Sequence, residues 1–487
     1  MPGVVVSTAV RVGPTTTNAT PTATAFFVGV AERGPNGTAQ LISSFADYEA
    51  IYGGFVADGY LHQTVKTYFE EGGARCYISR AVFDGQNKAT INLLDAASPT
   101  PGTSITLTAS GAGTWANSQL KAEVLASGSN RRVQILLNDV VVFRTAFHST
   151  RAAIVDEINN STTAALYVTA ANGASALIPA QVSATLFSGG SDGTVIDGDN
   201  VVTALGAFLP DYGPGCVAAP GFIDATTYAG LIAHAKNNNR IALLGFAETA
   251  TVGSAVSTAA TYVGEGDGEE FAAFFYPWVK IPSTGSLTET IPCEGFVAAK
   301  RAAVQNTYGA WYPYAGEQAK AKYVVGIENA ISKTNVETLA AGYINPLRVV
   351  NGSLRVYGAR TISTDEINFK FLNSRETLNL IVSQAETTLE DFLFRPIDGR
   401  GAIFAEIAAS LTGIMERIRV AGGLYELIGT DGTPIDSGYS IIVNESINPL
   451  TQLAEGTIKA KVGARVSSIG EVIELEITKS TLTATLV

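Results

Sequence analysis

The sequence VYGARTIS occupies residues 356–363 and opens the region Leu354–Gly423, around which the rest of the chain is organised. Two long segments follow in which apolar residues recur at steps of three and four, a spacing that predicts two amphipathic core helices. Pro396 stops the first helix, because proline disfavours helical geometry in the residue before it, and Gly422-Gly423 suits the end of the second. The apolar positions are Leu378, Ile381, Val382, Ala385, Leu389, Phe392 and Leu393, then Ile403, Ile407, Leu411, Ile414, Met415 and Ile418.

The composition indicates a chain with sizeable cores and little surface charge. Its 487 residues suggest about two to four domains. Hydrophobic residues make up 46% of the chain, which is ample for those cores. Charged residues make up only 16%, below the roughly 25% of typical soluble domains. Low charge with abundant glycine, threonine and alanine suits a subunit that buries much of its surface in an assembly.

Several classes of function are disfavoured by the same totals. The net charge is −12 with no cluster of lysine and arginine, so direct nucleic-acid binding is not expected. Cys76, Cys216 and Cys293 are widely spaced and odd in number, which predicts neither a disulfide framework nor a metal site and suits a reducing cytoplasm. We expect no signal peptide, and no apolar run approaches the ~20 residues of a membrane span.

The N-terminal residues are expected to form an arm. Val4, Val5 and Val6 are β-branched and suit a strand, whereas Pro14–Thr24 has little to bury and should be extended. Two interpretations follow: a frayed terminus, or an arm that adds a strand to a neighbour's sheet.

Residues 91–195 read as an inserted, mainly β domain. Apolar and charged residues alternate over residues 120–124, as in a strand with one buried face. Asn138-Asp139 predicts a hairpin turn into the next strand, and one short helix is expected near Arg151–Asn159.

Residues 196–353 alternate between strands and helices, which predicts an α/β core with a mostly parallel sheet and right-handed crossovers. Asp224 can cap a helix that runs to Asn238. The apolar run Phe271–Val279 reads as one buried strand, and Pro292 suits the start of a helix over Glu294–Tyr308.

The chain ends in strands. Tyr439–Val443 and Thr457–Val466 are two of them. In Val472–Thr478 the apolar residues Ile473, Leu475 and Ile477 alternate with polar and charged residues, so one face of this last strand should be buried. That strand either closes a hairpin within its own domain or crosses to a neighbouring subunit.

The candidate catalytic residues of the sequence are Ser191 and three histidines. Ser191 lies in GGSDG, which fits the Gly-x-Ser-x-Gly elbow of hydrolases, but the following residues read as a loop where the elbow needs a helix. The histidines are His62, His148 and His234, and each reads as a surface or packing residue. We therefore predict no catalytic, cofactor-binding or metal site.

Ordered sequence blocks resemble the sheath proteins of contractile phage tails and related injection machines. The blocks are Gly358-Ala359-Arg360-Thr361 with its two helices, Arg33-Gly34-Pro35 after a strand, Gly72-Gly73-Ala74-Arg75, Gly113-Thr114-Trp115-Ala116-Asn117, Tyr276-Pro277-Trp278 and Gly309-Ala310-Trp311. The resemblance spans about residues 2–425. Ala116 stands where the family has glycine, and Tyr314 is inserted between Pro313 and Ala315, so these two turns can differ from the family pattern.

The resemblance implies a subtilisin-like α/β core within a chain that is α+β overall. It implies hexameric rings stacked around an inner tube, with terminal arms inserted as strands into neighbouring C-terminal domains. The expected segments are the N-terminal arm 1–22, an α/β segment 23–90, the inserted domain 91–195, the core 196–353, an α+β C-terminal domain 354–466 and the C-terminal arm 467–487.

Partners follow from the same resemblance: further copies of this chain, a tail tube protein, and baseplate and tail terminator proteins, in a virion tail assembled in the bacterial cytoplasm. The arm residues would be Val4, Val5, Val6, Ile473, Leu475 and Ile477. The helices that face the tube or lie within the C-terminal domain would carry Glu386, Glu390, Asp391, Glu406, Arg417 and Arg419. The alternatives are a phage-derived injection machine, a degenerate subtilisin-fold hydrolase, and a surface-layer protein or adhesin, which the absent signal peptide disfavours.

Overall fold

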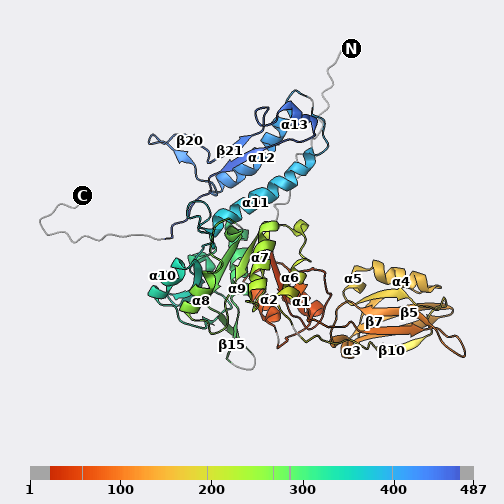
Figure 1. Ribbon diagram of the computed structural model, residues 1–487. Helices are drawn as coiled ribbons and strands as arrows, with labels where there is room; N and C mark the ends of the chain where they lie inside the picture. Colours follow the sequence, from red (N-terminus) through yellow and green to blue (C-terminus); the bar gives the residue numbers. More distant parts are fainter. Residues whose placement is uncertain are drawn as a thin grey trace, which may run out of the picture.

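The computed structural model describes residues 22–57, 59–194, 196–266, 268–283, 287–397 and 399–471. The protein is mixed α and β, and three parts are visible: an α/β body, a β-rich lobe beside it and a helical C-terminal part above it (Figure 1). No helix within the described ranges is long and apolar enough to cross a membrane. The arm residues Val4, Val5, Val6, Ile473, Leu475 and Ile477 lie outside the described residues.

An eight-stranded sheet forms the centre of the body. Its order is β18-β17-β13-β12-β11-β1-β3-β2, and the six strands from β17 to β3 are parallel. The outermost strands, β18 and β2, pair antiparallel, so the expected mostly parallel sheet is present. The strands are β1 (Ala25–Gly29), β2 (Gln40–Ile42), β3 (Cys76–Arg80), β11 (Gly215–Ala218), β12 (Arg240–Leu244), β13 (Ala272–Tyr276), β17 (Ile344–Val350) and β18 (Ser353–Val356).

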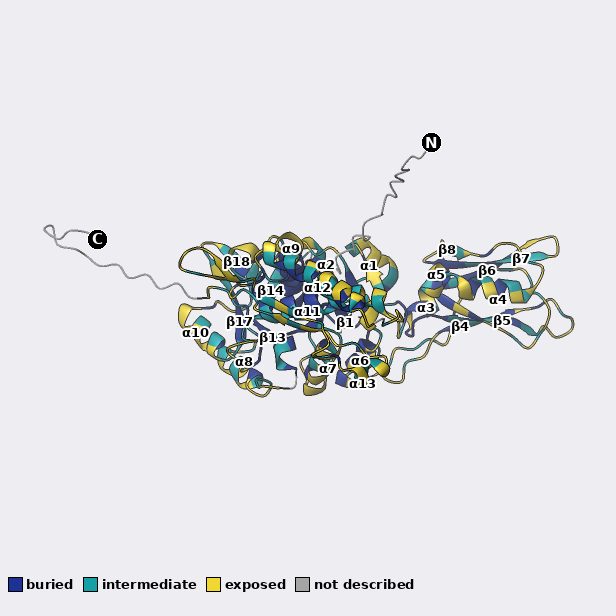
Figure 2. Cartoon of the chain, turned by 90° about the horizontal axis from the view of Figure 1, so that it is seen from above, coloured by how far each residue is buried: buried dark blue, intermediate teal, exposed yellow. Residues whose placement is uncertain are grey.

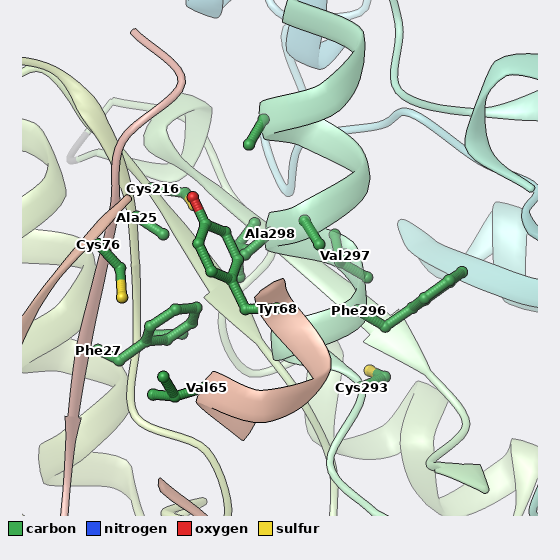
Figure 3. Packing of buried hydrophobic residues seen from close by; sticks show 14 of the residues in the cluster. Ala25, Phe27, Val65, Tyr68, Cys76, Cys216, Cys293, Phe296, Val297 and Ala298 are labelled. Carbon is green, nitrogen blue, oxygen red and sulfur yellow. The ribbon is translucent and has the colours of Figure 1, made fainter. Parts of the chain in front are cut away.

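Helices cover both faces of this sheet, which is why its central strands read as nearly continuous apolar runs. Phe27 of β1 points into one core and packs against Tyr68 and Val65 (Figure 3), whereas Phe26 lies in the core on the opposite face. The Phe27 face carries α1 (Phe45–Tyr52), α2 (Leu61–Glu70) and α9 (Glu294–Tyr308). The Phe26 face carries α6 (Gly198–Leu205), α7 (Ala225–Asn237), α8 (Val252–Ala259) and α10 (Lys333–Ala341).

Local sequence sets the ends of these elements. The Asp224 side chain accepts a hydrogen bond from the Thr227 N–H and caps α7, as expected. The expected single strand over Phe271–Val279 is wrong: β13 ends at Tyr276, and β14 (Val279–Pro282) belongs to a separate sheet with β15 (Thr288–Ile291) and β16 (Gly326–Ile327). Pro277 separates the two strands, because proline has no N–H to donate to a ladder.

The β-rich lobe has its own hydrophobic core and lies beside the body (Figure 2). The hairpin expected at Asn138-Asp139 is present, with positive φ angles of 50° and 66°. One sheet contains β4 (Thr90–Leu94), β5 (Thr103–Ala109) and β9 (Val168–Asn172), and the other contains β6 (Leu120–Ser127), β7 (Asn130–Leu137), β8 (Val140–Arg144) and β10 (Val182–Leu186). The helices are α3 (Trp115–Gln119), α4 (Arg151–Asn160) and α5 (Thr162–Ala165).

The C-terminal part is built on two long helices. These are α11 (Leu372–Leu389) and α12 (Ala402–Val420), and all six apolar positions predicted for the second helix are buried. Small strands and a short helix follow: β19 (Leu427–Ile428), β20 (Pro434–Asp436), β21 (Tyr439–Ile442), α13 (Leu450–Ala454) and β22 (Lys461–Ala464). The strand expected over Thr457–Val466 is therefore shorter than predicted.

The first long helix ends earlier than its apolar pattern predicts. After Leu389 only a 3₁₀ turn over Glu390–Phe392 continues it, so the expected place of Leu393 on the buried face is wrong. Leu393 is 56% exposed, and Phe394 is fully exposed with a φ of 61°. Phe394 thus has left-handed backbone geometry two positions before Pro396, and the helix does not extend through it. The apolar period of the sequence therefore runs on beyond the end of the helix.

Candidate functional site

The three histidines lie on separate elements of the structure. His62 of α2 lies 3.3 Å from a Glu49 oxygen, and His148 of the β-rich lobe is paired with Glu157. His234 of α7 lies against Arg240, and burial together with that guanidinium lowers the pKa of His234 to about 4. A catalytic base needs a nucleophile and an orienting acid within hydrogen-bond reach, and these three positions do not share such a site.

Ser191 belongs to a turn. Its hydroxyl accepts a hydrogen bond from Asn87 Nδ2 at 3.1 Å, and its backbone forms a bridge with Asn87. The next helix, α6, begins only at Gly198, whereas a nucleophile elbow requires a helix directly after the serine. The turn joins the β-rich lobe back to the body.

The cysteines are structural residues of the body. Cys76, Cys216 and Cys293 are buried and free. Burial raises the pKa of each thiol, which disfavours the reactive thiolate. Among the residues that the structure describes, no cluster of histidine, cysteine or acidic side chains could hold a metal ion.

A buried ion pair connects the body to the C-terminal part. Arg301 of α9 donates from Nε and Nη2 to the two carboxylate oxygens of Glu376 on α11, each at 2.6 Å. The side chains are 1% and 2% exposed. Burial opposes the charge of Arg301, but the adjacent carboxylate outweighs it and raises the pKa of Arg301 above its ordinary value. Glu376 is thus a buried acidic residue of α11.

The same arginine also binds Thr22, the first residue that the structure describes. Arg301 Nη1 donates to the Thr22 carbonyl oxygen at 2.7 Å. Ala23 and Thr24 are buried just before β1. The N-terminal segment, α9 and α11 thus meet at one guanidinium group.

A second buried pair stabilises the neighbouring turn. The ammonium group of Lys300 contacts the Glu71 carboxylate, and both side chains are at most 1% exposed. That carboxylate also accepts hydrogen bonds from the backbone N–H groups of Lys322, Tyr323 and Val324. These donors compensate a buried charge, as a paired ion requires.

Trp311 fits between two glycines from distant parts of the chain. A Cβ atom at Gly309 would lie 2.4 Å from Trp311 Cζ2, and one at Gly423 would lie 2.8 Å from Trp311 Cδ2. Ala310 next to it is buried in the hydrophobic cluster of the C-terminal helices. The Gly309-Ala310-Trp311 motif and the Gly422-Gly423 stop therefore form two sides of one contact between the body and the C-terminal part.

The C-terminal end of the described chain is held close to the N-terminal one. Asn373 Nδ2 donates to the Ser467 carbonyl at 2.9 Å, and the Ser467 N–H donates to Gly423 at 3.0 Å. Arg360 then binds both carboxylate oxygens of Glu471 at 2.7 and 2.6 Å. Asn373 and Glu376 are one turn apart on α11, so both terminal segments depart from the same helix end.

A small open sheet lies on the two long helices. β21 and β22 pair only with each other among the described residues. A groove of about 340 Å³ separates β22 from the apolar side of α11, and a second of about 710 Å³ lies between the same sheet and residues 366–374. The first groove is lined by Leu378, Ile381, Val382, Ala385, Glu386, Leu389, Leu411, Ala460, Val462 and Ala464.

The charged residues predicted on the two helices fall into two groups. Glu406 pairs with Arg395, and Arg419 pairs with Glu416 and Glu426. The Arg417 side chain is exposed and reaches Gln384 at 3.4 Å. The exposed acids form no ion pair among the described residues and are Glu386, Glu390 and Asp391.

Sequence reasoning missed the junction residues Arg301 and Lys300. The sequence feature that could have indicated them is the Lys-Arg pair inside the otherwise apolar helical sequence FVAAKRAAV. Charged residues in such a buried helix need buried partners.

The architecture is similar to that of several solved structures. No family model matches the chain, and no curated protein matches its sequence. Solved structures do match. The sheath of an extracellular contractile injection system in its contracted state is 17% identical, with a TM-score of 0.58 over 99% of this chain and 98% of that one. The sheath tail protein Lin1278 of Listeria innocua is 14% identical, with a TM-score of 0.58 over 87% of this chain and 89% of that one. A chain of the anti-feeding prophage baseplate is 15% identical, with a TM-score of 0.55 over 98% of this chain and 100% of that one. The chain therefore has the contractile tail sheath fold.

Proposed function

We propose that this chain is the structural subunit of a contractile tail sheath. Copies polymerise as stacked hexameric rings around a tail tube and contract to drive the tube through the bacterial envelope. The fold supports this proposal. The observation that carries it is the open sheet of β21 and β22, which lies on α11, the helix beside whose N-terminal end both terminal segments depart.

The terminal segments link subunits by strand addition. Val4, Val5 and Val6 of one copy, and Ile473, Leu475 and Ile477 of another, extend the β21–β22 sheet of a neighbour. The groove beside β22 offers apolar surface for alternate side chains of an added strand. Each main-chain hydrogen bond contributes a net ~0.5–1.5 kcal/mol, so an added strand of about five residues contributes a few kcal/mol. Main-chain linkage also persists while side-chain contacts change during contraction.

The domains take the places implied by the resemblance. Residues 196–353 are a subtilisin-like core, 91–195 an outward-facing insertion, and 354–466 the C-terminal domain between the arms 1–22 and 467–487. We propose that the sheath assembles in a strained extended state, and that this stored energy drives contraction. The chain is a structural protein and catalyses no reaction.

The tube meets the C-terminal helices. Glu386, Glu390 and Asp391 are the best candidates for this contact, because they are exposed and have no ionic partner of their own in the described part of the chain. Baseplate proteins lie at one end of the polymer, and terminator proteins lie at the other. The machine is a phage tail assembled in the bacterial cytoplasm, or an injection system derived from one.

The arm model is tested by removing residues 1–20. The truncated protein should stay folded by circular dichroism and remain monomeric by light scattering at concentrations where the full chain polymerises. Val4→Pro/Val5→Pro, which removes two main-chain N–H donors, should have the same effect. Val4→Ala/Val5→Ala keeps these donors and should still polymerise. Normal polymers from the truncated chain would refute the arm model.

A further inference from the structure

A small hairpin, formed by β19 and β20, projects from the C-terminal part beyond its long helices (Figure 1). Its two strands pair only with each other among the described residues. Two of its apolar side chains are largely exposed, Ile428 at 59% and Ile435 at 70%. An isolated two-stranded hairpin is at best marginally stable in water. Apolar side chains exposed at such a place therefore indicate a surface that another molecule covers.

The tip of the β19–β20 hairpin has a defined shape and carries one free acid. Asp431 Oδ1 accepts hydrogen bonds from the Thr433 N–H at 3.0 Å and from the Thr433 hydroxyl at 2.7 Å. The Gly429 N–H donates to the Thr433 carbonyl at 2.7 Å, which closes the turn. Asp431 is exposed and forms no ion pair with any residue that the structure describes.

A groove of about 380 Å³ lies where the body meets the C-terminal helices, separate from the two grooves beside the β21–β22 sheet. Trp311 of the turn after α9, Leu380 of α11 and Ile418 of α12 give it apolar walls. Arg417 is the one charged side chain among the described residues that line it. This guanidinium reaches Gln384 at 3.4 Å and has no carboxylate partner within the described ranges. The groove thus combines apolar walls with one free positive charge.

The hairpin is held away from the groove of its own chain. Leu424 before it and Tyr439 after it pack in the hydrophobic cluster of the C-terminal helices. At its base, Asp436 accepts a hydrogen bond from Arg465 at 2.9 Å. These contacts fix the base of the hairpin while its tip points away from the helices (Figure 1). The groove is therefore open to a hairpin from another copy.

We propose that the β19–β20 hairpin of a second copy docks in this groove. Its Ile428 and Ile435 lie against Trp311. Its Asp431 lies beside Arg417, so a free carboxylate meets a free guanidinium. The hairpin and the groove are different surfaces of one chain, so the contact is head-to-tail and repeats from copy to copy. The contact rests on the proposed sheath function only for the shape of the polymer that it builds.

Cysteine cross-linking between two full-length variants tests this contact. The native cysteines are buried, so engineered thiols can be oxidised selectively. Thr430→Cys places a thiol at the exposed hairpin tip, and Gln384→Cys places one on the groove wall. Each protein carries one engineered thiol, so a disulfide between hairpin and groove forms only when the two proteins are mixed. Thr430→Cys mixed with Asp156→Cys is the matched control, since Asp156 is exposed on the β-rich lobe.

We expect the hairpin–groove disulfide to form at least about tenfold faster than the control disulfide, because docking raises the local thiol concentration. Equal rates would overturn the proposal. A disulfide that forms only after residues 1–20 are removed would also overturn it, because the chain's own N-terminal segment would then occupy the groove. Cross-linked oligomers without cylinders would support the contact and reject the sheath. Cylinders that form without the disulfide would reject the contact alone.

Substitutions separate the apolar from the charged part of the contact. Ile435→Ser should slow the hairpin–groove disulfide at least about tenfold, whereas Val140→Ser, at a 65% exposed position of the β-rich lobe, should not change it. Asp431→Asn keeps the acceptor oxygen of the turn but removes the charge, and Arg417→Gln removes the opposite charge. Each should slow the disulfide about threefold, and both together no further, because either change already removes the pair. Effects of the two that multiply, or an unchanged rate with Ile435→Ser, would overturn the proposal.

Discussion

The buried pair of Arg301 and Glu376 should respond strongly to a single substitution. Glu376→Gln keeps the size of the side chain but leaves the guanidinium of Arg301 buried without its counter-charge. The pair is 1% and 2% exposed with two contacts of 2.6 Å. At about 4 Å and an effective dielectric constant near 20, the lost attraction is about 4 kcal/mol, and breaking buried pairs generally costs ~3–5 kcal/mol.

Urea unfolding followed by far-UV circular dichroism measures this loss. The exposed pair of Arg395 and Glu406 gives the control, since its contact is 2.8 Å but its side chains are 45% and 57% exposed. Glu406→Gln should cost less than ~1 kcal/mol. Arg301→Met/Glu376→Leu should recover most of the stability, except for the ~1 kcal/mol hydrogen bond to Thr22. If Glu376→Gln costs no more than Glu406→Gln, the pair does not hold the two parts together.

Three further predictions concern single residues. Burial raises the pKa of Glu294 from 4.5 to about 7. The contribution of this group to the free energy of unfolding is therefore complete below pH 4.5 and is lost as the pH rises through 7. Glu294→Gln should reduce the difference in unfolding free energy between pH 5 and pH 8 by up to about 3 kcal/mol. Gly423→Ala should lower the free energy of unfolding by ~1–3 kcal/mol, because the added methyl group overpacks against Trp311. Gly413 has open space around it, so Gly413→Ala should raise the free energy of unfolding by up to ~1 kcal/mol. Thermal unfolding of the two variants measures both effects. Ser191→Ala should hydrolyse a chromogenic ester at the same background rate as the unaltered protein, and a loss of activity would revive the hydrolase alternative.

Patterns that depend on neighbouring residues were readable from the sequence. The six apolar positions predicted for α12 are all buried, because a helix with one apolar stripe has only one way to shield it. The strand and helix alternation likewise predicted the mostly parallel sheet, because parallel strands need crossover connections. The early end of α11 could not be predicted, because Leu393 continues the apolar spacing of the sequence although the helix has already ended at Leu389.

Contacts between distant segments could not be predicted. Nothing near Arg301 indicates that its partner is Glu376, because the pairing depends on how α11 packs against α9. Trp311 and Gly423 each appear as a local motif, and only the folded chain shows that they touch. The shared exit of the two terminal segments has the same origin, as it depends on the position of α11.

Electron microscopy of the negatively stained full-length protein tests whether this chain forms a contractile sheath. The protein should be examined at high concentration, alone and after co-expression with its proposed tube and baseplate partners. We expect hollow, striated cylinders that are wider than a tube. Monodisperse monomers under both conditions would contradict the proposal that this chain forms a contractile sheath.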